Sequence, residues 1–232
     1  MKKQTKLLSI FIAFAIIVST FTTQATKLCP TDTNLISASE KASVSRILSL
    51  YKDKKYKKAK KMCKKLPQTA SEQCEKNMSS KMKKAYLRKV KSYNADYDYG
   101  YSKDEHILDY YLADITNNGK AELIVRHAYS DIATSSCTIY KYKKGKAVKL
   151  GTISTSHTYL YAYPNHPGII GVQKIMGCET VERYYVKHSK IQTKRIGYRE
   201  DIPRVEDYIE FPYKLEGHAS SEGSGISYDA LQ

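Results

Sequence analysis

Between residues 35 and 93 the apolar positions recur with the three- and four-residue spacing of amphipathic helices. Three stripes follow one another: Val44, Ile47, Leu48 and Tyr51; Tyr56, Ala59, Cys63 and Leu66; and Met78, Met82, Ala85, Tyr86 and Val90. Pro67 ends the second stripe. The pairs Ser37 with Glu40 and Thr69 with Glu72 have the spacing of capping boxes. We therefore expect residues 26–93 to form a small helical bundle or hairpin.

From residue 107 onward the pattern changes to short runs rich in Tyr, Ile and Val, separated by Asn, Gly and Pro turn signals. The runs are Ile107–Ala113, Leu123–Tyr129, Cys137–Tyr142, Ala147–Ile153, Tyr159–Tyr163, Gly168–Ile175 and Val181–Val186. Such close spacing favours an antiparallel β-meander over βαβ units. The chain is thus predicted to be α+β, with a linker at 94–106, a β-module at 107–215 and a flexible Gly- and Ser-rich tail at 216–232.

The first 25 residues have the order of a secretory signal peptide. Three lysines precede an apolar run from Leu7 to Val18, and small or polar residues follow up to Ala25. The run is shorter than the roughly 20 apolar residues that a spanning helix needs. The bulky Leu28 before Cys29 argues against lipidation. We expect cleavage after Ala25 and a secreted, extracellular mature protein.

The net positive charge of the chain after the signal peptide comes from the predicted helices. Residues 26–93 hold 19 Lys and Arg against 5 Asp and Glu, whereas residues 94–232 hold 17 against 18. The densest part is a run of lysines that is either a solvated helix face or a polyanion-binding surface: Lys54, Lys55, Lys57, Lys58, Lys60, Lys61, Lys64 and Lys65. Outside a cell the abundant polyanions are cell-wall polymers and anionic membrane surfaces. A nucleic-acid partner is not expected, because export separates the chain from it.

Five cysteines follow the signal peptide, and an oxidising compartment permits disulfides. Cys63 and Cys74 flank the Pro67 turn, so a bridge between them is one candidate. Cys137 and Cys178 lie in predicted strands and form a second candidate pair. Cys29 is left over. The alternative is that some or all of these thiols stay reduced.

One loop has the ligand spacing of a calcium site. Oxygen donors at alternating positions and a glycine at the sixth position are typical of such loops. The donors here are Asp114, Thr116, Asn118, the carbonyl of Lys120 and Glu122, with Gly119 at the sixth place. Two carboxylates give less charge than good sites have, so the loop is predicted to hold Ca²⁺ weakly or to be a metal-free turn.

The strand before this loop, the Asp-initiated Asn/Gly loop and the following Glu122-Leu123-Ile124-Val125 together resemble the repeat unit of FG-GAP and VCBS-type β-propeller domains. They are most similar to versions in small secreted proteins of Gram-positive bacteria (Firmicutes). The resemblance covers about residues 107 to 196 and implies a calcium-binding, partly propeller-like module. Thr116 departs from the Asp usual at that place, and a single Asp loop does not imply a full propeller.

Catalytic motifs are scarce. His157 and His166 flank a Tyr-rich strand and are expected to face one pocket if the protein is a hydrolase. Cys137 is formally available as a nucleophile, but its position in a strand favours packing or a disulfide. The chain has no Gly-x-Ser-x-Gly sequence and no zinc-protease helix motif. The many tyrosines alternate as strand residues do, so packing is their expected use, with carbohydrate binding as the alternative.

The sequence therefore favours a non-enzymatic binding protein, whose basic helices adhere to anionic cell-envelope polymers and whose β-module binds a ligand or calcium weakly. The alternative is an extracellular hydrolase acting on cell-wall or carbohydrate polymers, with a cleft at His157 and His166.

Overall fold

The computed structural model describes residues 38–70, 78–93, 106–128, 132–218 and 227–232. The predicted signal peptide, Cys29, Cys74, Ser37 of the first capping box, Glu72 of the second and the predicted linker up to residue 105 lie outside these residues. Within the described residues no helix is both long enough and apolar enough to span a bilayer.

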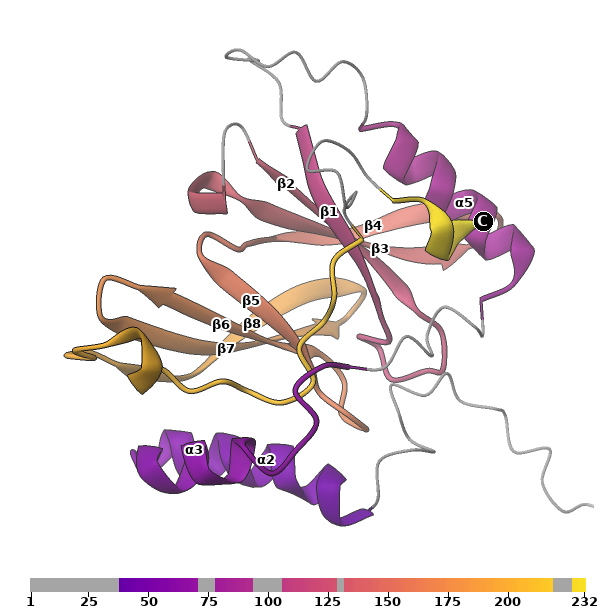
Figure 1. The fold of residues 1–232 in the computed structure, drawn as a ribbon. Coiled ribbons are helices and arrows are strands. Elements are labelled where there is room, and N and C mark those ends of the chain that lie inside the picture. The colour runs from indigo at the N-terminus through magenta and orange to yellow at the C-terminus, as the bar shows by residue number, and fades with distance from the viewer. Residues whose placement is uncertain (1–37, 71–77, 94–105, 129–131, 219–226) are drawn as a thin grey trace, which may run out of the picture.

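The chain is an α+β protein with two four-stranded antiparallel sheets, each in sequence order (Figure 1). The first sheet consists of β1 (His106–Ala113), β2 (Glu122–Ala128), β3 (Ser136–Lys143) and β4 (Lys146–Ser154). The second consists of β5 (Thr158–Ala162), β6 (Ile169–Ile175), β7 (Cys178–Lys187) and β8 (Lys190–Arg199). Short 3₁₀ turns lie at Ile132–Thr134 (η1), Val205–Asp207 (η2) and Asp229–Leu231 (η3). The predicted meander is thus confirmed, as two sheets.

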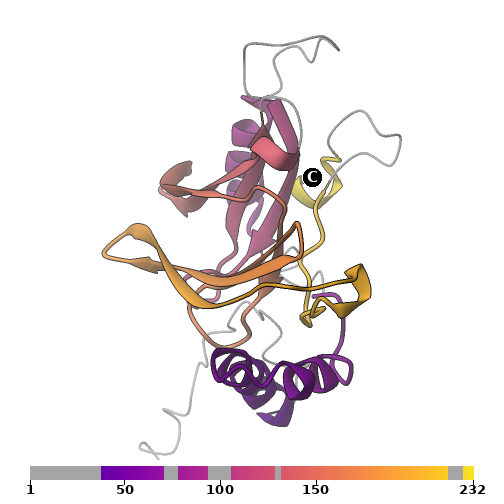
Figure 2. The same cartoon turned by 90° about the vertical axis from the view of Figure 1, so that its left-hand side faces the viewer.

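Three helices precede the sheets: α2 (Ala38–Lys52), α3 (Tyr56–Cys63) and α5 (Ser80–Lys91). The three do not form one bundle, although α2 and α3 pair with each other. Helices α2 and α3 pack together beneath the second sheet, while α5 lies on the far side of the first sheet (Figures 1 and 2). Each helix has a single apolar stripe, which it buries against the nearest sheet, and Tyr51 of α2 also contacts Tyr56 of α3 with 5.2 Å between ring centres.

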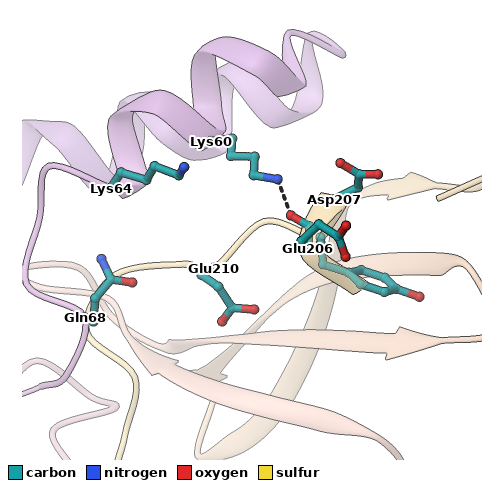
Figure 3. A pocket seen from close by; sticks show the side chains of 7 residues that line it. Lys60, Lys64, Gln68, Glu206, Asp207 and Glu210 are labelled. Atoms are coloured by element: carbon teal, nitrogen blue, oxygen red, sulfur yellow. Dashed lines mark hydrogen bonds between the residues drawn. The ribbon is translucent and has the colours of Figure 1, made fainter. Parts of the chain in front are cut away.

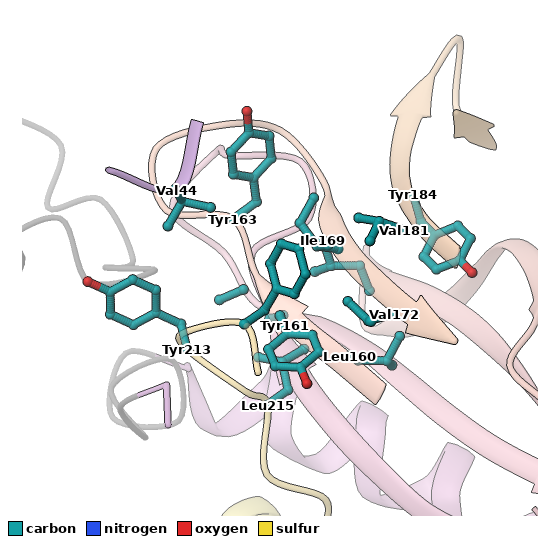
Figure 4. Close-up of a cluster of buried hydrophobic side chains, with 14 of the residues drawn as sticks. Val44, Leu160, Tyr161, Tyr163, Ile169, Val172, Val181, Tyr184, Tyr213 and Leu215 are labelled. Atoms are coloured by element: carbon teal, nitrogen blue, oxygen red, sulfur yellow. The ribbon is translucent and has the colours of Figure 1, made fainter. Parts of the chain in front are cut away.

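The alternation of side chains in the first sheet explains this layering. In β1, Tyr110 and Leu112 face α5, whereas Tyr111 and Ala113 face the second sheet. The second sheet is covered on both faces, by the first sheet and by α2 and α3, so β5 is buried at Leu160, Tyr161 and Ala162 in succession. Figure 4 shows part of this shared core, in which Val44 of α2 joins the strand residues.

Thr69 forms an isolated bridge with Lys214, and its expected partner Glu72 lies outside the described residues, so the second capping box stays a prediction. The cap of α5 is Ser79, whose hydroxyl accepts a hydrogen bond from the amide of Met82 at 3.3 Å. Strand β8 was not predicted, because its residues are mostly exposed and charged, as suits a strand at the end of a sheet.

A C-terminal segment joins the two sheets. We call residues Lys214–Gly217 the strap. The amide of Leu215 donates to the carbonyl of Leu160 in β5 at 2.9 Å, and just beyond the strap the amide of His218 donates to Tyr110 in β1 at 2.8 Å. The segment expected to be a free tail from residue 216 therefore begins as part of the fold.

Candidate functional site

A cavity of about 380 Å³ lies where the strap passes over the junction of the two sheets. We call it the junction cavity. Strands β1 and β2 supply Asp109, Tyr111 and Arg126, strand β5 supplies Tyr159, and the strap supplies Lys214 and Glu216. A concave site where structural layers meet, with a few converging polar groups, is the usual form of a small-ligand site.

Its inner wall is a buried charge pair. Asp109 and Arg126 are opposite each other in the β1–β2 ladder, and Asp109 Oδ2 lies 3.7 Å from Arg126 Nη1. The side chain of Arg126 is only 8% exposed. Its Nη2 donates to the carbonyl of Thr158 at 3.1 Å, and the Tyr111 hydroxyl donates to Asp109 Oδ2 at 2.9 Å. The pair is therefore fixed in position by both sheets.

The Asp109 carboxyl is incompletely satisfied. Within the described residues its Oδ1 atom is buried and has no hydrogen-bond partner. Burial raises the pKa of Asp109, against the opposing effects of Arg126 and the Tyr111 hydroxyl. A buried acceptor without a donor is costly, and such atoms gather at functional sites more often than elsewhere.

The outer wall is cationic and aromatic. Lys214 Nζ lies 4.6 Å from the centre of the Tyr159 ring, and that ring is 40% exposed. Gly217 is pressed against Asp109: a Cβ atom at this position would lie 2.6 Å from Asp109 Oδ2. Only a residue without a side chain lets the strap pass so close.

Sequence reasoning missed Asp109, Arg126 and Lys214 as site residues. A usable signal was present, since Asp109 and Arg126 interrupt two apolar strands at positions that alternate with core residues. Their approach to Lys214 depends on the return of the chain 88 residues after Arg126 and 105 after Asp109, which no local pattern encodes.

The predicted calcium loop forms a closed set of hydrogen bonds. Asp114 accepts the amides of Asn118 and Gly119, at 3.0 and 2.7 Å. Glu122 accepts the amides of Ile115 and Thr116, at 2.8 and 3.1 Å, and the Thr116 hydroxyl at 3.1 Å. The side-chain oxygen of Asn118 accepts the amide of Lys120. The carboxyl groups thus hold the turn together without a cation.

Burial is the main electrostatic effect on these two carboxyl groups. Asp114 and Glu122 are each 2% exposed. Burial, and then the neighbouring Asp114 charge, raise the pKa of Glu122 to about 8, and burial raises that of Asp114. No salt bridge to either group is found in the described part of the chain. The side-chain oxygens expected to bind calcium already take part in the hydrogen bonds of the turn, and no cluster of three or more His, Cys, Asp or Glu is found in the described residues, so calcium binding stays a prediction.

The basic run on α3 divides into two groups. Its apolar stripe, Ala59 and Cys63, is buried, and the lysines around it are exposed apart from the half-buried Lys60. Lys60 and Lys64 line an open groove of about 680 Å³ whose opposite wall carries Glu206, Asp207 and Glu210 (Figure 3). Lys60 Nζ donates to the Glu206 carbonyl.

The lysines turned away from this groove form the accessible basic surface. Lys57, Lys58, Lys61 and Lys65 are exposed, and no ion pair to any of them is found within the described residues. Lys54 is exposed at the α2–α3 turn, while Lys55 lies 3.5 Å from Asp53.

The two histidines proposed for a hydrolase cleft do not meet. His157 precedes β5 and His166 follows it, and neither lines the junction cavity or the α3 groove. His166 Nε2 lies instead 2.9 Å from the Ser45 hydroxyl of α2, and its ring stacks on Tyr163 with 4.4 Å between centres. Burial, and then the charge of Arg183, lower the pKa of His166.

Cys63, Cys137 and Cys178 are free thiols in the structure, so the candidate Cys137–Cys178 bridge is absent. The reason is position: Cys137 is buried in the first sheet beside Thr155, whereas Cys178 begins β7 of the second sheet and accepts a hydrogen bond from Tyr198. Cys63 is unbridged in this structure as well; its candidate partner Cys74 lies outside the described part, and a bridge between them stays a prediction.

No protein-family model matches this chain, and no curated protein and no solved structure is significantly similar to it.

Proposed function

We propose that this chain is a secreted binding protein that adheres through α3 to an anionic cell-envelope polymer and binds a ligand through its β-module. The observation that carries the adhesion is the accessible basic surface of α3. Its lysines are exposed and unpaired within the described residues, while Ala59 and Cys63 anchor the helix to the core. Unpaired surface cations attract phosphate-rich polymers and are readily screened by salt.

The β-module contributes the junction cavity and the Asp114 loop. Each four-stranded antiparallel sheet in sequence order is similar in form to a propeller blade, which supports the partial propeller likeness. The two carboxyl groups of the loop, Asp114 and Glu122, support weak calcium binding, which would add a cation to a turn that hydrogen bonds already order.

The experiment measures binding of the full mature chain to immobilised wall teichoic acid as the salt concentration rises. Lys57→Gln, Lys58→Gln and Lys61→Gln are combined in one variant. We expect this variant to bind about tenfold more weakly at low salt, since three exposed ionic contacts are worth roughly 0.2–1 kcal/mol each.

The matched control combines Lys143→Gln, Lys144→Gln and Lys146→Gln at the exposed β3–β4 hairpin, which removes the same charge elsewhere. Equal weakening by both variants would mean that adhesion depends only on net charge, and it would contradict a site on α3. Binding that persists in molar salt would also contradict it. Stronger binding to phosphatidylglycerol vesicles than to the polymer would identify a membrane surface, and not the polymer, as the partner.

An extracellular hydrolase is the second candidate, and one contact favours it. The 2.9 Å separation of Ser45 Oγ and His166 Nε2 is within the reach of a nucleophile and its base, and a lowered pKa keeps the imidazole unprotonated near neutral pH. No carboxylate is hydrogen-bonded to His166 in the described residues. Labelling by a fluorophosphonate probe that Ser45→Ala and His166→Ala both abolish would support the hydrolase, and unlabelled wild-type protein would count against it.

A further inference from the structure

We propose that the junction cavity binds a small zwitterion, a free α-amino acid or a short peptide, with the ammonium group on Asp109 and the carboxylate on Lys214. This inference deepens the ligand-binding role proposed above for the β-module and rests on it. It does not depend on the lysines of α3.

The charges that line the cavity are balanced. Arg126 and Lys214 are cationic, and Asp109 and Glu216 are anionic. A simple anion would meet two carboxylates and a simple cation would meet two positive groups. A molecule that carries both charges can place each against its opposite, because Asp109 lies on the inner wall and Lys214 on the outer one.

The unpartnered Asp109 Oδ1 specifies what the inner wall needs. Oδ2 already accepts the Tyr111 hydroxyl and faces Arg126, whereas Oδ1 has no donor within the described residues. An ammonium group offers three N–H donors, and a hydrogen bond between charged groups is stronger than one between neutral groups. Oδ1 itself is enclosed, so a ligand ammonium would approach the carboxyl group through the part of the Asp109 side chain that is exposed, 17% of it.

Size and access restrict the ligand further. A volume of about 380 Å³ is near the lower end for small-molecule sites, which suits an amino acid or dipeptide better than a polymer. Lys214 and Glu216 are exposed and form the mouth, while Gly217 closes the cavity against Asp109. The Arg126 side chain is too enclosed to extend toward a ligand, so it contributes only positive charge from the wall of the cavity.

The experiment is calorimetric titration of the full mature chain with alanine and alanylalanine at millimolar concentration. N-acetylalanine lacks the ammonium, alaninamide lacks the carboxylate, and glucose tests the carbohydrate alternative. We expect at least one of the two zwitterions to bind and both blocked analogues to bind about tenfold more weakly, the loss expected for one charged hydrogen bond. Preference for alanylalanine over alanine would identify a peptide.

Lys174→Gln is the matched control for Lys214→Gln. Both ammonium groups lie over the Tyr159 ring, at 4.6 and 5.5 Å, but only Lys214 lines the cavity. Lys214→Gln should weaken zwitterion binding about two- to fivefold, as for one exposed ion pair, and leave alaninamide unaffected. Lys174→Gln should change neither.

Asp109→Asn should abolish measurable zwitterion binding, with a thermal melt to show that it folds. Equal binding of zwitterions and blocked analogues, preference for glucose, equal effects of the two lysine variants, or no binding of any probe would each overturn the proposal. The α3 triple variant should bind the zwitterion as wild type does, so failure of the adhesion and failure of this site are seen separately.

Discussion

Individual buried carboxyl groups stabilise the loops of the β-module by accepting hydrogen bonds from backbone amides. Glu179 is fully buried, accepts the amide of Ile209 at 2.9 Å and lies 3.3 Å from Arg199. Glu122 binds the amides at the start of the loop after β1. A carboxylate can accept several amides at once, so one side chain fixes a turn that lacks regular backbone pairing.

The raised pKa of Glu122 predicts a pH dependence of stability. The folded pKa of about 8 exceeds the ordinary value of 4.5, so the folded state binds the proton more tightly. The contribution of this group is greatest below the unfolded pKa and is lost as pH rises toward 8. Urea unfolding should show stability falling between about pH 5 and about pH 8, by up to about 1.4 kcal/mol per pH unit, and less so in Glu122→Gln. Parallel curves for the two proteins would contradict this.

Calcium should act in the opposite direction, because it binds ionised carboxylates. We expect calcium to raise the melting temperature of wild type at alkaline pH and to have no effect on Asp114→Asn. The gain is a few tenths of a kcal/mol if the dissociation constant is near the ligand concentration. If wild type melts identically in calcium and in chelator, the loop is a metal-free turn.

The described thiols should differ in reactivity. Burial raises the pKa of Cys63 to about 12 and that of Cys137 to about 11, so neither forms appreciable thiolate at neutral pH. Cys178 is half-buried. Iodoacetamide on the native protein should alkylate Cys178 first, as read by peptide mass spectrometry. Mapping without reduction also tests the Cys63–Cys74 bridge, and rapid native labelling of Cys137 would contradict the buried position in β3.

At the scale of elements, α2 is fitted closely to the second sheet. A Cβ atom on Gly197 of β8 would lie 2.8 Å from the Tyr51 ring of α2, and the Tyr51 hydroxyl donates to the Glu179 carbonyl at 3.2 Å. The helix therefore rests directly on the backbone of β8. This contact makes α2 a layer of the fold and not an appendage.

Gly197→Ala should thus destabilise the protein by about 1–3 kcal/mol, the usual cost of overpacking. In a Tyr51→Leu background, which removes the ring, the further cost of Gly197→Ala should be much smaller. Urea unfolding of the two single variants and the double variant gives the coupling energy. Additive effects would mean that Tyr51 and Gly197 are not in contact.

How far the sequence predicts these elements depends on how each is buried. The stripes on α2, α3 and α5 are strong because one face of each helix is buried, for example at Ile47, Ala59 and Tyr86. Strand β8 lacks such a signal, since its side chains are largely exposed. The Ser79 cap of α5 was missed because Met82, three residues further on, is not the Glu or Gln of a capping box.

At the scale of the whole molecule, the sequence does not tell which layer each helix covers. Periodicity shows that Tyr51 and Tyr86 are buried, but not that they lie against different sheets. The junction cavity escapes prediction for the same reason, because its walls come from β1, β2, β5 and the strap. Residue 93 therefore marks a change in the sequence pattern but not a boundary between hydrophobic cores, because each core cluster contains residues from both sides of it.

The last prediction follows from that shared core. A chain that starts at residue 94 lacks all three described helices and uncovers both faces that they bury, including the sites of the fully buried Tyr51 and Tyr86. Losing one large buried aromatic costs about 3–5 kcal/mol, and a whole domain is stable by only about 5–15 kcal/mol. The shortened chain should show no cooperative melt and should bind the dye ANS. A cooperative melt with native near-UV circular dichroism would show instead that the sheets fold alone. If the prediction holds, the adhesion proposed for α3 and the ligand binding proposed for the junction cavity belong to one folding unit, and they can be separated only by substitutions on the surface.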